Sequence, residues 1–343
     1  MKILSTLIVV LFISITSFAQ NFENAGEYIG YIGKQQESIT KKYLSYSSAV
    51  AHGKRARKVE SLRSKLMDEV QEARMNINAM PSFKGDKGYR DSSVKFMKFY
   101  FNVLNDDYSK IINLEDVAEQ SYDDMEAYIL AQEMVDKKLK EANDMIKAAQ
   151  LDFGKKYNIN IIEDKSELGK MAEQVHNTNE YFHKIYLLFF KASFQEENLM
   201  KAIEKGNITG IEQSKSSLLK YAQEGLEKVN EIKPFEGDNS LIASFKAVMN
   251  FYVKEVNDKM KTISDFFLTN ERFEALKKEM DKKGDNRTQA DIDAYNKSVN
   301  EINAASNKYN QNNKQLFEMR KEVIDNWNDA SNDFFNEHTP RYK

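Results

Sequence analysis

The hexapeptide Pro81-Ser82-Phe83-Lys84-Gly85-Asp86 recurs later in the chain as Pro234-Phe235-Glu236-Gly237-Asp238, one residue shorter between the proline and the phenylalanine. From the phenylalanine onward, the two copies align without a gap at an offset of 152 residues. Matches farther along keep their order: Met97, Phe99, Tyr100, Asn105 and Asp106 correspond to Met249, Phe251, Tyr252, Asn257 and Asp258. Solenoid repeats have periods of only about 20–50 residues. The sequence therefore predicts the duplication of a whole helical unit.

The segments around the repeat have the periodicity of amphipathic helices. Apolar residues recur three and four positions apart, for example from Val94 to Leu104 and from Leu218 to Val229. This spacing is typical of helices with a broad buried face, and the alternating runs typical of strands are nearly absent. We expect helices at 23–51, 55–79, 88–112 and 116–153, then at 167–204, 209–231, 239–268 and 289–336, with a short extra helix near 270–283. Short connections between such helices favour antiparallel neighbours. The predicted fold is all-α, with two tandem duplicated up-down four-helix units.

The predicted organisation of the chain follows from these helices. Residues 1–19 form a signal peptide, 20–153 the first unit, 154–166 a linker and 167–343 the second unit. A later match, between residues 124–128 and residues 291–295, has an offset of 167. This offset predicts that the second unit has gained about 15 residues, around 269–284.

Several helix ends have recognisable signals. Gly53 and Gly206 suit helix C-termini, where a left-handed backbone is needed. Asp86 and Asp238 follow their turns directly, so each carboxylate is expected near the free N–H groups of the next helix. Thr288 and Asp291 have the spacing of a capping box, with Asp in place of the usual Glu.

Composition excludes several classes of protein. The chain has 343 residues, 50 Lys and Arg against 53 Asp and Glu, and three prolines. Its apolar fraction of 41% is too high for a disordered chain. A net charge of −3 gives no general attraction to nucleic acid, which we do not expect as a partner. The absence of cysteine excludes disulfides, thiol catalysis, cysteine-bound metal centres and a lipid-modified N-terminal cysteine.

The first 19 residues have the features of an export signal. Lys2 provides a positive charge, residues 3–15 are largely apolar, and Ser17 and Ala19 are small residues at the positions that signal peptidase recognises. We expect cleavage after Ala19 and no transmembrane helix in the mature chain, whose longest strongly apolar run is residues 185–190. The predicted location is the periplasm or the cell surface, without a lipid anchor.

Four segments resemble known exported proteins. They are Ala19-Gln20-Asn21-Phe22, His52-Gly53-Lys54-Arg55, Pro81-Ser82-Phe83-Lys84-Gly85-Asp86 and Tyr221-Ala222-Gln223-Glu224-Gly225-Leu226. Together they resemble a family of exported helical proteins of Bacteroidota, similar to a surface-protein family defined on leptospiral sequences. The resemblance covers most of the chain and implies export and surface display. It implies no reaction, no cofactor and no catalytic residue.

Two histidines suggest a metal site. Glu173 and His176, and then Glu180 and His183, form two Glu-x-x-His motifs seven residues apart. On one helix these four residues form a single stripe, and imidazole and carboxylate groups are ligands for zinc and related divalent metals. Di-iron bundles take such motifs from two different helices, however. The alternative interpretation is an ordinary polar helix face. His52 and His338 are expected to be loop or tail residues.

One basic cluster and one aromatic stripe offer other surfaces. Lys54, Arg55, Arg57 and Lys58 are candidates for binding phosphate, lipid headgroups or an acidic polysaccharide, or form a solvated helix end. The aromatic residues between 181 and 194 have the spacing of helix core, and are otherwise candidates for a ligand groove.

No catalytic constellation is recognisable in the sequence. A Gly-rich phosphate loop, a nucleophile elbow and a His-Glu-x-x-His motif are all missing. We therefore predict a non-catalytic envelope or surface protein with a binding or structural role, whose partner is an unidentified protein or glycan. A metal-binding bundle centred on the Glu-x-x-His pairs is the alternative. A carrier of lipid or glycan in a groove between the two units is a third hypothesis.

Overall fold

The computed structural model describes residues 22–107, 122–161 and 166–343, and these are almost entirely helical. The elements are α1 (Ala25–Ala51), α2 (Ala56–Asn78), α3 (Gly88–Asn102), the π-helix η1 (Val103–Asp107), α5 (Tyr122–Lys156), α6 (Glu167–Glu204), α7 (Ile208–Val229), α8 (Ser240–Lys254), the π-helix η2 (Glu255–Lys259), α9 (Met260–Lys283), the 3₁₀-helix η3 (Gly284–Asn286) and α10 (Gln289–His338). The prediction of an all-α fold is confirmed.

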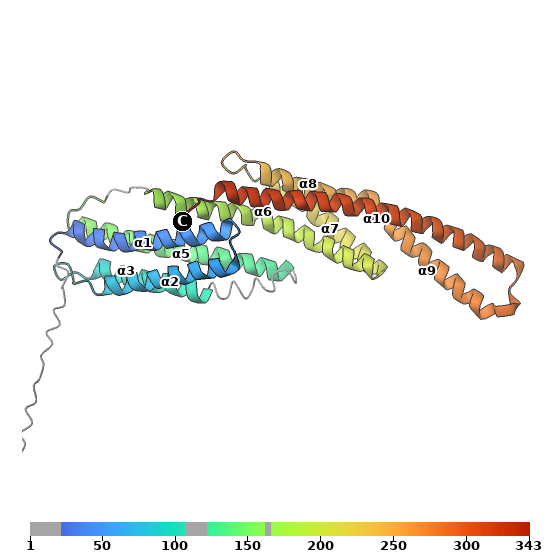
Figure 1. The fold of residues 1–343 in the computed structure, drawn as a ribbon, viewed down its shortest axis with the longest axis horizontal. Helices are drawn as coiled ribbons and strands as arrows, with labels where there is room; N and C mark the ends of the chain where they lie inside the picture. Colours follow the sequence, from blue (N-terminus) through green and yellow to red (C-terminus); the bar gives the residue numbers. More distant parts are fainter. Residues whose placement is uncertain (1–21, 108–121, 162–165) are drawn as a thin grey trace, which may run out of the picture.

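The helices form an elongated molecule (Figure 1). Helices α1, α2, α3 and α5 pack side by side at one end, each against its neighbour in the chain. Helices α7, α8 and α10 pack together beside them, and the hairpin of α9 and α10 extends to the far end. The predicted signal peptide, residues 1–19, lies outside the described residues.

Helix α6 belongs to both groups. It packs against α7, α8 and α10, and it also packs against α1 and α5. The sequence assigned this helix to the second unit alone. Its 38 residues are long enough to cover part of both groups. Any site under the first half of α6 is therefore built from both predicted units.

The signals at helix ends act as expected. Gly53 and Gly206 have φ angles of 60° and 62°, in the left-handed region. Thr288 and Asp291 form the predicted capping box at the start of α10. The backbone N–H of Gly88 donates to Asp86 and that of Ser240 donates to Asp238, at 2.8 and 2.7 Å.

The third helix of each predicted unit ends in the same irregularity. Helix α8 and η2 lie 152 residues after α3 and η1, at matching bounds. A π-helix of five residues thus interrupts both helices at the same place. In the second unit, α9 continues directly from η2 to Lys283. The predicted break before a short helix at 270–283 is therefore wrong.

The cores of the two groups share a pattern of burial. Buried residues of α2 recur in α7 at an offset of 152: Leu66, Val70, Ala73 and Ile77 correspond to Leu218, Ala222, Gly225 and Val229. The rings of Tyr28, Phe83 and Phe153 form one cluster, with centroids 5.4 to 5.7 Å apart. The rings of Tyr181, Phe235 and Phe334 form its counterpart, with centroids 5.0 to 5.5 Å apart.

These clusters fix the correspondence between the helices of the two groups. By ring position, α1 matches α6 at an offset of 153, from Tyr28 to Tyr181, and the end of α5 matches the end of α10 at 181, from Phe153 to Phe334. The offset of 167 seen in the sequence does not extend to these helix ends. The origin of the two groups by duplication stays a prediction.

Candidate functional site

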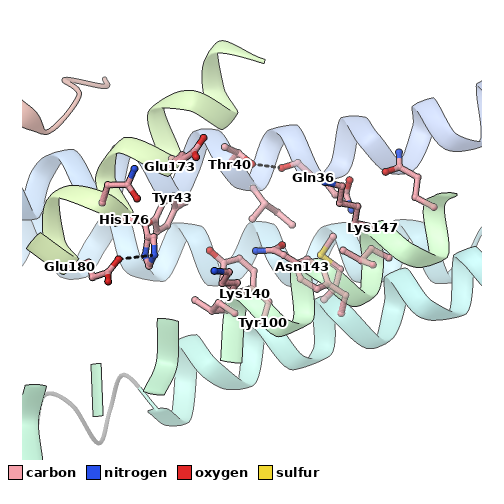
Figure 2. A pocket seen from close by; sticks show the side chains of 18 residues that line it. Gln36, Thr40, Tyr43, Tyr100, Lys140, Asn143, Lys147, Glu173, His176 and Glu180 are labelled. Atoms are coloured by element: carbon pink, nitrogen blue, oxygen red, sulfur yellow. Dashed lines mark hydrogen bonds and ion pairs between the residues drawn. The ribbon is translucent and has the colours of Figure 1, made fainter. Parts of the chain in front are cut away.

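A groove lies where α6 crosses over the first group of helices. In the described residues, α1 and α5 make no extensive contact with each other, and each packs against α6 instead. Between them, above α3, is a groove with a volume of about 750 Å³. Figure 2 shows the side chains of all four helices pointing into it.

The floor of this groove is apolar. Its six residues come from α1, α3 and α5: Ile39, Phe96, Met97, Tyr100, Leu139 and Ile146. Met97 is fully buried, and Ile39 and Ile146 are nearly so. Burial raises the pKa of the Tyr100 hydroxyl, which therefore stays neutral.

The rim of the groove is polar and carries charges of both signs. It is formed by Gln36, Thr40, Lys140, Asn143, Lys147, Glu173, His176 and Glu180 (Figure 2). The two lysines come from α5 and the two glutamates from α6. An apolar floor below a polar rim of mixed charge is suited to an amphiphilic molecule.

The groove exists because the first group lacks side chains that fill the same seam in the second. Between α6 and α10, the rings of Phe189 and Trp327 stack with centroids 4.4 Å apart. At the offsets of 153 and 181, their counterparts are Gln36 and Ile146, which line the groove. A pair of large stacked rings is thus replaced by two smaller side chains, and the seam stays open.

The predicted metal stripe is divided by this arrangement. Glu173, His176 and Glu180 line the groove, whereas His183 is not among its lining residues. His176 Nε2 lies 3.9 Å from Glu180 Oε2, and Lys184 donates to Glu180 at 2.8 Å. That hydrogen bond holds the pKa of Glu180 below its usual range, and burial lowers the pKa of His183.

The four stripe residues do not converge on one point. In the described part of the chain, the His and carboxylate group whose ligand atoms lie within 4.8 Å of one another is Asp238, Glu337 and His338. The expectation that His338 is a loop or tail residue is wrong, because it ends α10 and is buried. Metal binding by the stripe itself stays a prediction.

The basic cluster lies away from the groove. Lys54, Arg55, Arg57 and Lys58 are all exposed, at the turn between α1 and α2. None of them lines the groove. Its role as a binding surface stays a prediction.

A buried ionic cluster in the second group was missed from the sequence. Arg320 of α10 makes an ion pair with Glu196 of α6 and another, 2.5 Å long, with Glu255 of η2. The side chain of Glu255 is fully buried. Burial raises the pKa of Glu255 to about 7, Arg320 opposes this rise, and the charge of Glu196 adds to it. The corresponding residues of the first group, Leu139, Tyr43 and Val103, are not charged, so a comparison of the repeats offered a signal.

No described helix is both long and apolar enough to cross a bilayer. Comparison with protein-family models, with curated proteins and with solved structures found no match to this chain. The resemblance to exported helical proteins therefore stays a prediction.

Proposed function

We propose that this chain is an exported, non-catalytic binding protein, and that its ligand is an amphiphile held in the groove under α6. The observation that carries the proposal is the open seam between α1 and α5, which has an apolar floor and a polar rim. Ligand pockets of proteins typically have volumes of about 300–1,000 Å³ and few polar groups in a largely apolar lining. The groove fits this description.

The distribution of polarity favours a lipid-like ligand over a glycan. Ile39, Met97 and Ile146 offer buried apolar surface to an acyl chain or ring system. Lys140 and Glu180, at the rim, offer opposite charges to a polar head. A glycan needs hydrogen-bond partners along its whole length, which this floor lacks.

The groove proposal is tested by filling the seam as the second group fills it. We expect the double variant Gln36→Phe/Ile146→Trp to fold, because Phe189 and Trp327 form the same pair in the second group. N-phenyl-1-naphthylamine should fluoresce in the groove of the unsubstituted protein and be displaced by lauric acid. The double variant should bind this probe at least about tenfold more weakly, since the filled seam excludes it.

A control places the same large ring outside the groove. Met145 neighbours Ile146 on α5 but is 67% exposed. Met145→Trp should therefore bind the probe like the unsubstituted protein. Unchanged binding by the filled variant, or probe binding that lauric acid does not displace, would contradict an amphiphile site in this groove.

Export has a separate test. Lys2, the apolar run 3–15 and the small residues Ser17 and Ala19 predict cleavage after Ala19. N-terminal sequencing of the protein from the envelope or culture fluid of its own cells should begin at Gln20. Recovery of the protein only from the cytoplasm, with Met1 retained, would reject export and leave the groove proposal intact.

A further inference from the structure

The two Phe-x-Gly-Asp turns have the same backbone. In each, the phenylalanine and the aspartate exchange two backbone hydrogen bonds of 2.8 to 3.0 Å. The residues between them also match, because Lys84 and Glu236 have φ angles of 51° and 52°, and a glycine with positive φ follows each. Differences between the turns therefore lie in their side chains.

The first turn is closed by a lysine and a tyrosine. Lys156 Nζ donates to Asp86 Oδ2 at 2.7 Å, and the Tyr157 hydroxyl donates to the same oxygen at 3.2 Å. The ring of Tyr157 also packs edge-on against Phe83, with centroids 4.9 Å apart. The charge of Asp86 is thus balanced by the end of α5.

The second turn has a glutamate and a histidine at these places. By the offset of 181 between α5 and α10, Glu337 corresponds to Lys156 and His338 to Tyr157. His338 Nε2 lies 2.9 Å from Asp238 Oδ2, and its ring packs edge-on against Phe235 with centroids 5.0 Å apart. The imidazole therefore replaces the phenol in the same environment.

The charges around the second aspartate are reversed. Lys84 and Lys156 accompany Asp86, whereas Glu236 and Glu337 stand at the corresponding places near Asp238. Three carboxylates now surround one histidine, and Glu236 Oε2 lies 3.8 Å from His338 Nδ1. Like charges gathered in this way repel one another. A bound cation relieves that repulsion.

The histidine is held in place before any cation binds. Only 8% of the His338 side chain is exposed, and its ring lies between Phe235 and Phe334. The Thr178 hydroxyl donates to the backbone carbonyl of His338 at 3.0 Å. Although burial alone would raise the pKa of Asp238, hydrogen bonds from the Ser240 N–H and from His338 hold it below its usual range, so this carboxylate is ionised.

We propose that Asp238, Glu337 and His338 bind one divalent transition-metal ion of the Zn²⁺ type. Their ligand atoms lie within 4.8 Å of one another, and small movements of the exposed Glu337 bring them to the 2.0–2.2 Å metal–ligand bonds that zinc requires. An imidazole nitrogen selects zinc and related metals over Ca²⁺ and Mg²⁺, which prefer oxygen ligands. The metal would join the end of α10 to the turn before α8, as Lys156 joins α5 to the turn before α3.

Titration of the full chain with Zn²⁺ alone tests this proposal. Calorimetry should give one tight site per chain, and the melting temperature should rise with Zn²⁺ concentration. Ca²⁺ and Mg²⁺ at the same concentrations should have little effect. Affinity should fall as the pH drops below 6, because protons compete for the imidazole.

The matched variant is Glu337→Lys/His338→Tyr, which installs the pair that closes the first turn. The first turn already accommodates these residues beside the same backbone, so this variant should fold, and its Zn²⁺ affinity should be at least about 100-fold lower. A second variant, His176→Ala/His183→Ala, removes the sequence-predicted stripe and should bind like the unsubstituted protein. The proposal is overturned if the unsubstituted chain binds no Zn²⁺, or if binding is lost with the stripe and kept in the turn variant.

Discussion

Arg320→Leu should lower the free energy of unfolding by about 3–5 kcal/mol at pH 8, since removal of one partner leaves buried charge without compensation. The guanidinium lies between Glu196 and Glu255. Both carboxylates are largely removed from water, and that of Glu255 completely. Urea denaturation at pH 8, followed by far-UV circular dichroism, measures the loss.

The control replaces the whole cluster instead of one member. Glu196→Tyr/Glu255→Val/Arg320→Leu installs the residues found at the corresponding places of the first group, where Val103 is buried. Exchange of a complete buried ionic cluster for packed apolar residues is often neutral or stabilising. The triple variant should therefore recover most of the stability that Arg320→Leu loses. A triple variant as unstable as the single one would contradict this account.

The cost of Arg320→Leu should also depend on pH. Burial raises the pKa of Glu255 from 4.5 to about 7, so the folded state holds this proton more tightly than the unfolded state. The resulting stabilisation is complete below about pH 4.5 and is lost as the pH rises to about 7. At pH 5 most of the negative charge is already neutralised, and the same denaturation experiment should show a clearly smaller loss than at pH 8.

The sequence predicted the elements better than their assembly. Helix bounds followed from apolar spacing and from local signals such as Gly53, Gly206 and the Thr288 capping box, because these depend on neighbours in the chain. The sharing of α6 depends on packing between distant helices, to which periodicity within one helix is blind. The groove under α6 was for that reason only one of several hypotheses.

The charged clusters were missed for a related reason. Glu196 and Arg320 lie in helices rich in exposed charges, and nothing local distinguishes them. Only comparison with Tyr43 and Leu139 of the first group marks them as buried positions. That comparison requires the offset of 181 between α5 and α10, and the ring clusters of the structure supply it. The same offset places His338 opposite Tyr157.

Phe251→Ala should lower the free energy of unfolding by about 3–5 kcal/mol, the usual cost of truncating a buried phenylalanine. Its side chain is 5% exposed and its ring lies 5.7 Å from that of Tyr252. Phe99, its partner in the repeat, is only partly buried, against Val103 and Val135. Phe99→Ala should therefore cost less, about 1–2 kcal/mol, because part of this ring is in contact with water in both states.

Trp327 makes the comparison of these two variants more informative. It is the single tryptophan of the chain, it is buried, and it stacks on Phe189 in the second group. Urea unfolding followed by its fluorescence reports on that group, while circular dichroism reports on all helices. Since α6 packs against both groups, the two signals should coincide for both variants. Equal losses for Phe99→Ala and Phe251→Ala would contradict the difference in burial. A fluorescence transition untouched by Phe99→Ala would mean that the groups unfold separately despite α6.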